Sequence, residues 1–369
     1  MPAAKKTDAD RLHDAEEIIR KKNLELADNR RTIADLRREH DTAEKIRAEI
    51  KLLSEHTVNP PKWISGKDTK NGERGAPLTI WSDFHYGEVI DPDQVGGVNS
   101  FDMDVAKKRF TKLVNTTIDL CFNHMGRANV NYPGIVVCLG GDMIGGDIHE
   151  ELARTNDRTP HQSVNDLTDL LGSGLEAMAS KFGNVFVPCV VGNHGRSTHR
   201  PSMKNRVFTN YDWSIYTNLE RDFRKEKRIQ IMVPNEADAR FNMFGHRFLL
   251  THGDSLGVKG GDGIIGSLGP IKRGLMKLHD SKAQIGQDFD TALICHWHQY
   301  MTLPGLIVNG SLKGYDEFSL LGLRAKYARP TQALSFVHPE HGITAQWPVY
   351  LEKEFSQQKA KEWVSWPTT

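Results

Sequence analysis

Five apolar segments of this chain each run directly into side chains that can bind a metal ion or move a proton. The side chains are carboxylates, an amide and imidazoles, and the glycines among them allow sharp turns of the backbone. Because strand carboxyl ends are where sites assemble in open α/β sheets, we expect these groups to meet in space. The five motifs are Asp83-Phe84-His85, Gly140-Gly141-Asp142, Gly192-Asn193-His194, Thr251-His252 and Cys295-His296-Trp297-His298.

This mixture of nitrogen and oxygen donors predicts a site for two divalent metal ions. Residues two apart in an extended segment point the same way, so Asp83 with His85 and His296 with His298 would form two clips. Such ligands suit manganese first, or iron, zinc, nickel or cobalt, rather than calcium. Seven or eight ligands are too many for one ion, and two ions about 3.5–4 Å apart suit phosphoryl chemistry.

The order of the motifs resembles the calcineurin-like metallophosphoesterase superfamily. The resemblance covers residues 80–300 and extends weakly to Ile-Val-Asn-Gly-Ser at 307–311. It implies an α/β fold in which a two-sheet β-sandwich is flanked by helices. It further implies that Asp142 bridges two metals, that His194 donates a proton to the leaving oxygen, and that the glycines leave room for the phosphate. The remaining ligands would be Asp83, His85 and His298 for one metal, and Asn193, His252 and His296 for the other.

Each motif alone is weak support, because such residues at a strand end most often make a turn or decorate the surface. Asp147 and His149 could contact substrate or cap the next helix, and we favour the cap. Asp254 is expected to partner a ligating histidine. The Asp-Arg-Gly of the phosphoprotein phosphatases does not follow Gly141-Asp142, which argues against a Ser/Thr protein phosphatase.

Strands and helices alternate from residue 78 onward, and the later part is richer in strands. Apolar and β-branched runs predict the strands, and apolar residues on one face predict the helices. We expect helices at 102–124, 163–181 and 209–227, with Asp102 as a cap, and strands at 78–82, 134–140, 184–191, 228–233, 240–244, 247–252, 291–298, 305–311 and 333–337.

Residues 8–55 differ from the rest, since they contain neither glycine nor proline and alternate charges of both signs. Apolar residues recur every seven positions, which predicts a coiled coil about 70 Å long for self-association or a partner protein. The alternative is a solitary charged helix docked on its own domain. We divide the chain into a helix at 1–56, a linker at 57–77, a catalytic domain at 78–350 with inserts near 196–230 and 253–282, and a tail at 351–369.

The insert at 196–230 suggests the substrate. It holds nine Lys or Arg and four Asp or Glu, with aromatic residues among them. Basic and aromatic side chains together suit a nucleic-acid backbone and stacked bases, although the aromatics could equally pack on the core. The candidate substrate contacts are Arg196, Arg200, Lys204, Arg206 and Lys259.

These features favour a metal-dependent DNA nuclease, similar to the repair-exonuclease branch and to phage-encoded members of the superfamily. One alternative is a phosphodiesterase or phosphatase for small, even cyclic, nucleotides, which the net charge of +1 favours. A second is a scaffold with a vestigial metal site. Four scattered cysteines and the lack of a long apolar run lead us to expect a protein without a membrane span in a reducing cytoplasm, the host's if a phage encodes it.

Overall fold

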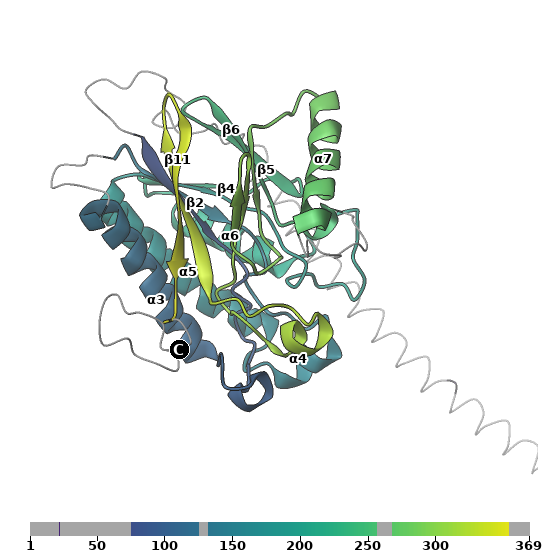
Figure 1. Ribbon diagram of the computed structural model, residues 1–369. Coiled ribbons are helices and arrows are strands. Elements are labelled where there is room, and N and C mark those ends of the chain that lie inside the picture. Colours follow the sequence, from purple (N-terminus) through teal and green to yellow (C-terminus); the bar gives the residue numbers. More distant parts are fainter. Residues whose placement is uncertain (1–21, 23–74, 125–131, 257–267, 354–369) are drawn as a thin grey trace, which may run out of the picture. The chain divides into compact units, whose positions relative to one another are not determined.

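The computed structural model describes Lys22 and residues 75–124, 132–256 and 268–353 (Figure 1). Apart from Lys22, the predicted coiled coil lies outside the described residues. Most of the predicted linker and tail also lies outside them. The first strand begins at Ala76, inside the range predicted as linker.

The first sheet holds six strands in the order β11-β10-β1-β2-β3-β4. Strands β1 to β4 run parallel to one another. Strand β10 pairs with β1 in the antiparallel sense, and β11 pairs with β10 in the same sense. The strands are β1 (Ala76–Trp81), β2 (Ile135–Leu139), β3 (Val185–Pro188), β4 (Ile229–Met232), β10 (Thr331–His338) and β11 (Gly342–Tyr350).

The second sheet holds five strands in the order β5-β6-β7-β9-β8. Strands β6, β7 and β9 are parallel, and β5 and β8 flank them in the antiparallel sense. The strands are β5 (Asp238–Met243), β6 (His246–Thr251), β7 (Thr291–Ile294), β8 (Met301–Leu303) and β9 (Leu306–Val308).

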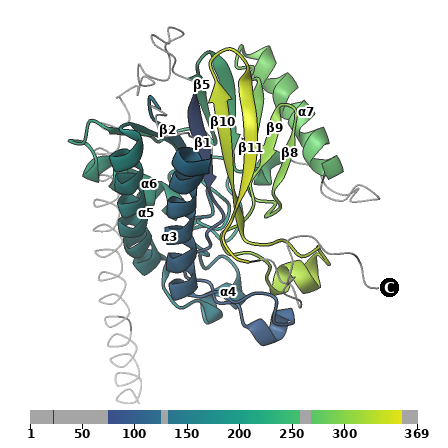
Figure 2. The same cartoon turned by 60° about the vertical axis from the view of Figure 1, so that its left-hand side comes forward.

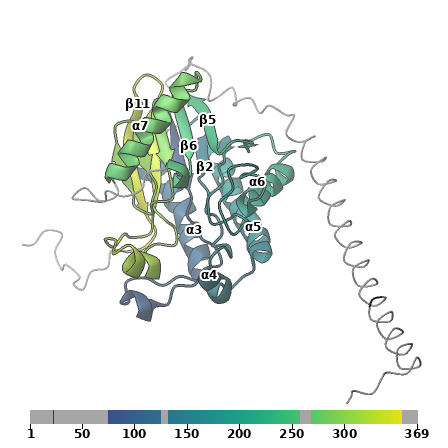
Figure 3. The same cartoon turned by 90° about the vertical axis from the view of Figure 1, so that its right-hand side faces the viewer.

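Helices cover the outer faces of both sheets, so the part of the chain described from residue 75 onward has four layers (Figure 2). One side carries α3 (Met103–Asp119), α5 (Pro160–Phe182) and α6 (Tyr211–Asp222), and α7 (Leu268–Gln284) lies over the second sheet (Figure 3). The shorter helical segments are η1 (Pro92–Val95), η2 (Leu120–His124), α4 (Glu150–Thr155), η3 (Asp254–Leu256) and η4 (Phe318–Gly322).

Alternation along the central strands explains the two interior layers. In β2, Ile135, Val137 and Leu139 face the helices, whereas Val136 and Cys138 face the second sheet. Because successive side chains of a strand point to opposite faces, a run that is apolar at every position supplies two cores at once. The prediction of two packed sheets flanked by helices is therefore confirmed.

The helix starts follow from capping residues. The Asp102 side chain accepts a hydrogen bond of 2.7 Å from the Val105 N–H, so the predicted cap of α3 is confirmed. Helix α5 begins with a reciprocal capping box between Thr159 and Gln162 and with a proline at its first position.

Helix α7 and strands β8 and β11 are among the elements that the sequence analysis missed. Helix α7 lies in the range predicted as an insert, where glycines and charges mask the apolar face that Ile271, Leu275 and Leu278 turn to the second sheet. Strand β8 has only three residues, and the edge strand β11 is half-buried and contains Pro348. Because apolar and polar residues alternate only weakly in these two strands, and because β11 contains a proline, their sequences have the pattern of loops.

Candidate metal centre

The predicted site residues follow the carboxyl ends of strands in both sheets. Strands β1, β2 and β3 of the first sheet and β6 and β7 of the second all contribute. Because the carboxyl ends of these strands lie at the same end of the two sheets, the structure brings together side chains that lie far apart in the sequence. The seven predicted ligands are Asp83, His85, Asp142, Asn193, His252, His296 and His298, and a ligand atom of His194 also lies within 4.8 Å of those of His85 and Asp142.

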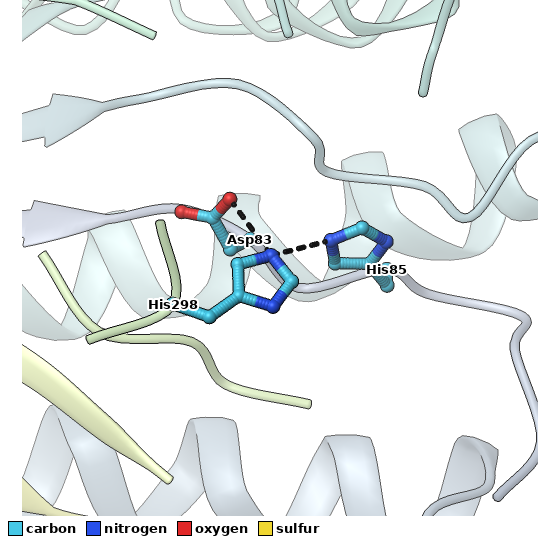
Figure 4. A group of neighbouring side chains, drawn as sticks. All are labelled: Asp83, His85 and His298. Carbon is cyan, nitrogen blue, oxygen red and sulfur yellow. Dashed lines mark hydrogen bonds and ion pairs between the residues drawn. The ribbon is translucent and has the colours of Figure 1, made fainter. Parts of the chain in front are cut away.

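The first cluster consists of Asp83, His85 and His298, whose ligand atoms all lie within 4.8 Å of one another (Figure 4). His298 Nε2 lies 3.3 Å from Asp83 Oδ1 and 3.1 Å from His85 Nε2. Asp83 and His85 are buried, and the side chain of His298 is 23% exposed. The cluster therefore has a closed side and a side that opens toward solvent.

The second cluster consists of Asp142, His252 and His296. His252 Nε2 lies 3.1 Å from Asp142 Oδ2 and 3.1 Å from the amide oxygen of Asn193. Asp142 Oδ2 also lies 4.0 Å from His85 Nε2, so this carboxylate stands between the two clusters. That placement is the one required of a bridging ligand.

Hydrogen bonds determine which nitrogen of two histidines carries a proton. His252 Nδ1 lies 2.8 Å from the carbonyl oxygen of Gly140, which can only accept, so Nδ1 is the donor. His85 Nδ1 lies 2.7 Å from Glu88 Oε1 and donates to that carboxylate in the same way. When neutral, both rings therefore present the lone pair of Nε2 to the site, as a metal ligand must.

The environment of Asp142 fits a cation. Its Oδ2 atom is buried, and within the described residues it has a hydrogen-bond partner only if His252 Nε2, 3.1 Å away, carries a proton. A buried carboxylate oxygen without a partner is costly, and the neutral imidazole would turn a second lone pair toward it. A divalent ion would satisfy both atoms, so these residues fit the metal ions that the sequence predicted.

The charge states follow from burial and neighbours. Burial, followed by the charge of Lys313, lowers the pKa of His85 to about 4, and burial followed by His252 lowers the pKa of His296 to about 4. Burial also lowers the pKa of His252, but the carboxylates of Asp142, Asp83 and Asp254 together outweigh it and raise the pKa to about 10. Without a metal, a second proton on His252 therefore occupies the position that a cation would take.

The backbone at the site is strained in a consistent way. Asp83, His85, Asp142, His296 and His298 all have φ between 49° and 71°, a region that non-glycine residues rarely adopt. The expectation that Asp83 with His85 and His296 with His298 lie on extended segments is therefore wrong. Such strain clusters at functional sites, where the surrounding structure enforces it.

Asp212, which the sequence analysis did not single out, ties two of the site loops together. Its Oδ2 accepts hydrogen bonds from the N–H groups of Asp142 at 3.0 Å and Gly192 at 2.9 Å, and its Oδ1 accepts from Met143 at 3.1 Å. The residue is fully buried at the start of α6. It thereby fixes the loops that carry Asp142 and Asn193, yet it lies 20 positions from the nearest of its partners.

His194 lies beside the clusters with one ring nitrogen engaged. Nδ1 is 3.1 Å from the carbonyl oxygen of Gly145, so it donates a proton there and leaves Nε2 free. The ring centroid lies 4.5 Å from that of His85, and the side chain is 19% exposed. The His194 N–H also donates to Asp142 Oδ1 at 2.7 Å, which joins the predicted acid to the predicted bridge.

The predicted substrate contacts are placed in different ways. Arg196 donates to the carbonyl oxygens of Asn193 at 2.7 Å and Thr198 at 3.1 Å, and so braces its own loop. Arg206 forms a two-pronged ion pair with Asp254 at 2.7 and 2.8 Å. Asp254 is thus paired with an arginine instead of hydrogen-bonding a ligating histidine as expected. Arg200 and Lys204 are exposed, and Lys259 lies outside the described residues.

The aromatic residues of the insert are divided between core and surface. Tyr216 is buried in the core, and its hydroxyl donates to the carbonyl oxygen of Val190 at 3.0 Å. Phe208 is 41% exposed and meets Trp213 edge to face at 5.8 Å. Phe208 is therefore the exposed aromatic ring of the insert, while Tyr211, Trp213 and Phe223 are half-buried against the core.

The segment before α4 differs from the expectation of a helix cap. His149 occupies the cap position but makes no capping hydrogen bond with its side chain. Its ring centroid lies 5.7 Å from that of His194, and both Asp147 and His149 are exposed. The alternative that His149 contacts substrate stays a prediction.

The glycines of the Gly-Asn-His-Gly motif serve close packing. A Cβ atom on Gly192 would lie 2.1 Å from Asp142 Oδ1, and one on Gly195 would lie 2.4 Å from Asn210 Oδ1. Both positions are filled by the protein itself, so the expectation that these glycines make room for a phosphate is wrong. Gly192 allows the loops of Asp142 and Asn193 to approach each other, and Gly195 allows its loop to approach Asn210 at the start of α6.

Comparisons with known proteins leave the family unassigned. No protein-family model matches the sequence, and no curated protein matches it. Among solved structures, the chain is similar to SoxB, a sulfate thiohydrolase of Thermus thermophilus in complex with glycerol, at 9% identity and a TM-score of 0.29. The match covers 77% of this chain and 58% of that one, which is less than two thirds of its length. In the described part of the chain, no helix is long and apolar enough to cross a bilayer.

Proposed function

We propose that this protein is a calcineurin-like phosphoric ester hydrolase that uses two divalent metal ions, manganese first among them. The observation that carries the proposal is Asp142 Oδ2, a buried carboxylate oxygen that lies between His85 and His252 and that either a cation or a proton on His252 must satisfy. Two ions held on either side would supply Lewis-acid charge to the phosphoryl oxygens and lower the pKa of a water. Asp83, His85 and His298 would hold one ion, and Asn193, His252 and His296 the other.

His194 would act as the general acid. Its Nδ1–H is held by the carbonyl oxygen of Gly145, so only Nε2 is available to donate a proton to the leaving oxygen. The ring is partly exposed, which lets a substrate reach it. The nearby Arg196 guanidinium, which braces the Asn193 loop, would orient the amide ligand and not the substrate.

DNA is the proposed substrate, with small nucleotides as the alternative. The local excess of five positive charges in 196–230 supports a polyanion, as does the exposure of Arg200, Lys204 and the Phe208 ring. Such a surface suits phosphates and unstacked bases. The second candidate, a small-nucleotide phosphodiesterase, is favoured by the fact that Arg206 is committed to Asp254 within the protein.

A substrate panel with Mn²⁺ or with EDTA tests the proposal. It would hold single- and double-stranded DNA, RNA, cyclic mononucleotides, bis-p-nitrophenyl phosphate and p-nitrophenyl phosphate. EDTA-sensitive cleavage of DNA that weakens steeply with added salt supports the nuclease. Cleavage confined to small esters supports the second candidate. A metal-loaded protein that cleaves none of them would instead support the scaffold.

An Arg200→Gln/Lys204→Gln variant separates the two substrate classes. Both side chains are exposed and lie outside the clusters, so hydrolysis of bis-p-nitrophenyl phosphate should stay unchanged. Cleavage of DNA should fall, and its salt dependence should become shallower by about one unit for each lost phosphate contact. We also propose, from the sequence alone, a cytoplasmic location and self-association or partner binding through residues 8–55.

A further inference from the structure

A buried carboxylate that the proposed function leaves without a role lies directly behind His85. Glu88 is 4% exposed, and its Oε1 accepts a hydrogen bond of 2.7 Å from His85 Nδ1. Its Oε2 accepts one of 2.7 Å from the ammonium group of Lys313, which is 3% exposed. Both carboxylate oxygens are therefore used, one for a candidate metal ligand and one for a buried cation.

We propose that Glu88 is a positioning residue that sets both His85 and His194. This inference rests on the proposed function, because it takes His85 as a metal ligand and His194 as the acid. Toward His85 the effect is direct: the hydrogen bond fixes the ring and places the proton on Nδ1, so that Nε2 faces Asp142 and His298. Partners of this kind orient ligating histidines and strengthen them as donors.

Toward His194 the effect passes through Gly145. A Cβ atom on Gly145 would lie 2.4 Å from Glu88 Cγ, so the glutamate packs tightly against this backbone. The carbonyl oxygen of the same glycine accepts the hydrogen bond from His194 Nδ1, and Glu88 Oε1 lies 3.9 Å from that nitrogen. One side chain thus supports the two rings from behind.

Lys313 and Asp316 hold Glu88 in turn. Lys313 Nζ lies 2.7 Å from Glu88 Oε2 and 2.8 Å from Asp316 Oδ2. The segment that carries Lys313 is bonded to the first cluster, because the Leu312 N–H donates to the carbonyl oxygen of Asp83 at 3.1 Å. Buried ion pairs of this kind contribute little net stability, so their presence here points to geometry as their purpose.

Metal binding by Glu88→Gln tests the inference without relying on catalysis. The amide keeps the shape of the side chain but loses the charge and one acceptor, so we expect the affinity for one of two Mn²⁺ ions to fall about 10–100-fold in calorimetric titration. Glu226→Gln is the matched control, because Glu226 is also ion-paired, with Arg228 at 2.8 Å, but precedes the amino end of β4. It should bind both ions as the wild type does.

A second readout separates positioning from a general loss of structure. At saturating Mn²⁺, Glu88→Gln should lower kcat and leave KM unchanged, since His194 is displaced while the substrate surface stays intact. Thermal unfolding in EDTA checks the fold. If Glu88→Gln does not fold, Glu88→Asp keeps the charge for Lys313 while drawing the carboxylate away from His85, and the same fall in affinity is expected.

The outcomes distinguish this inference from the proposed function. Wild-type protein that takes up no Mn²⁺ would refute the metal site and the inference with it. Wild-type protein that binds two ions while the folded Glu88 variant binds them with equal affinity would overturn the inference alone. Loss of one ion's affinity with unchanged binding by Glu226→Gln supports it.

Discussion

The Asp212→Asn substitution tests how the site loops are held. In the wild type, three backbone N–H groups converge on this buried carboxylate, those of Asp142, Met143 and Gly192. Asparagine offers one carbonyl oxygen and one NH₂ group in the same volume. At least one of the three N–H groups therefore loses its acceptor and faces another donor.

The expected cost follows from these contacts. A hydrogen bond to a charged group contributes about 1.5–3 kcal/mol, and a buried donor left without a partner costs about 1–3 kcal/mol. Both energies describe the same N–H group, so they are not added together. Burial and the neighbouring Asp142 also raise the pKa of Asp212 to about 7, so the wild-type carboxylate is itself costly, which offsets part of the loss. We expect a net destabilisation of about 2–4 kcal/mol.

Thermal unfolding in EDTA at pH 8 measures this loss. For a domain of this size the change corresponds to a fall in Tm of roughly 4–8 °C. Asp222→Asn is the control, since Asp222 is exposed at the end of the same helix, and its Tm should stay within about 2 °C. A Tm for Asp212→Asn equal to that of the control would refute the view that these three hydrogen bonds hold the loops.

Three further predictions concern the centre itself. His194→Ala should retain both metal ions by mass spectrometry and lose about 10²–10⁴-fold in kcat, as removal of a general acid does; loss of metal would reassign it as a ligand. Asp142→Asn should lower the metal content, and an unchanged content would remove its bridging role. Gly192→Ala should destabilise by about 1–3 kcal/mol in urea unfolding, because the new Cβ meets Asp142 atoms at 2.1 and 2.3 Å that hydrogen bonds hold in place. Wild-type stability of that variant would show that the two loops can separate.

Much of the fold could be predicted because the decisive signals are local. Continuous apolar runs predicted β1, β2 and β3, and each was followed by polar groups that the parallel topology gathers at one edge. The prediction of the backbone conformation at the site was wrong. Asp83 and His298 lie in the left-handed region, and no pattern of residue types indicates that region for a residue other than glycine. These side chains converge because the backbone turns at these residues and not because they lie on an extended segment.

The residues behind the site could not be predicted from spacing. Lys313 lies 225 positions from Glu88, and Asp212 lies 70 positions from Asp142, so their partnerships exist only in the folded chain. Each looks like an ordinary charged residue in its own segment. The sequence offers one signal for such buried partners, a charged residue inside a short stretch that is otherwise apolar or glycine-rich. Many surface loops have the same pattern, so it does not identify these residues.

The candidate centre is shared between the two sheets, since His85 follows β1 in one sheet and His298 follows β7 in the other. These residues are 213 positions apart, so an ion bound by both would act as a removable cross-link across a very long loop. An ion present at 1,000 times its Kd would add about 4 kcal/mol to the free energy of unfolding. Metal supply would then set how long the sandwich withstands proteases, independently of any substrate.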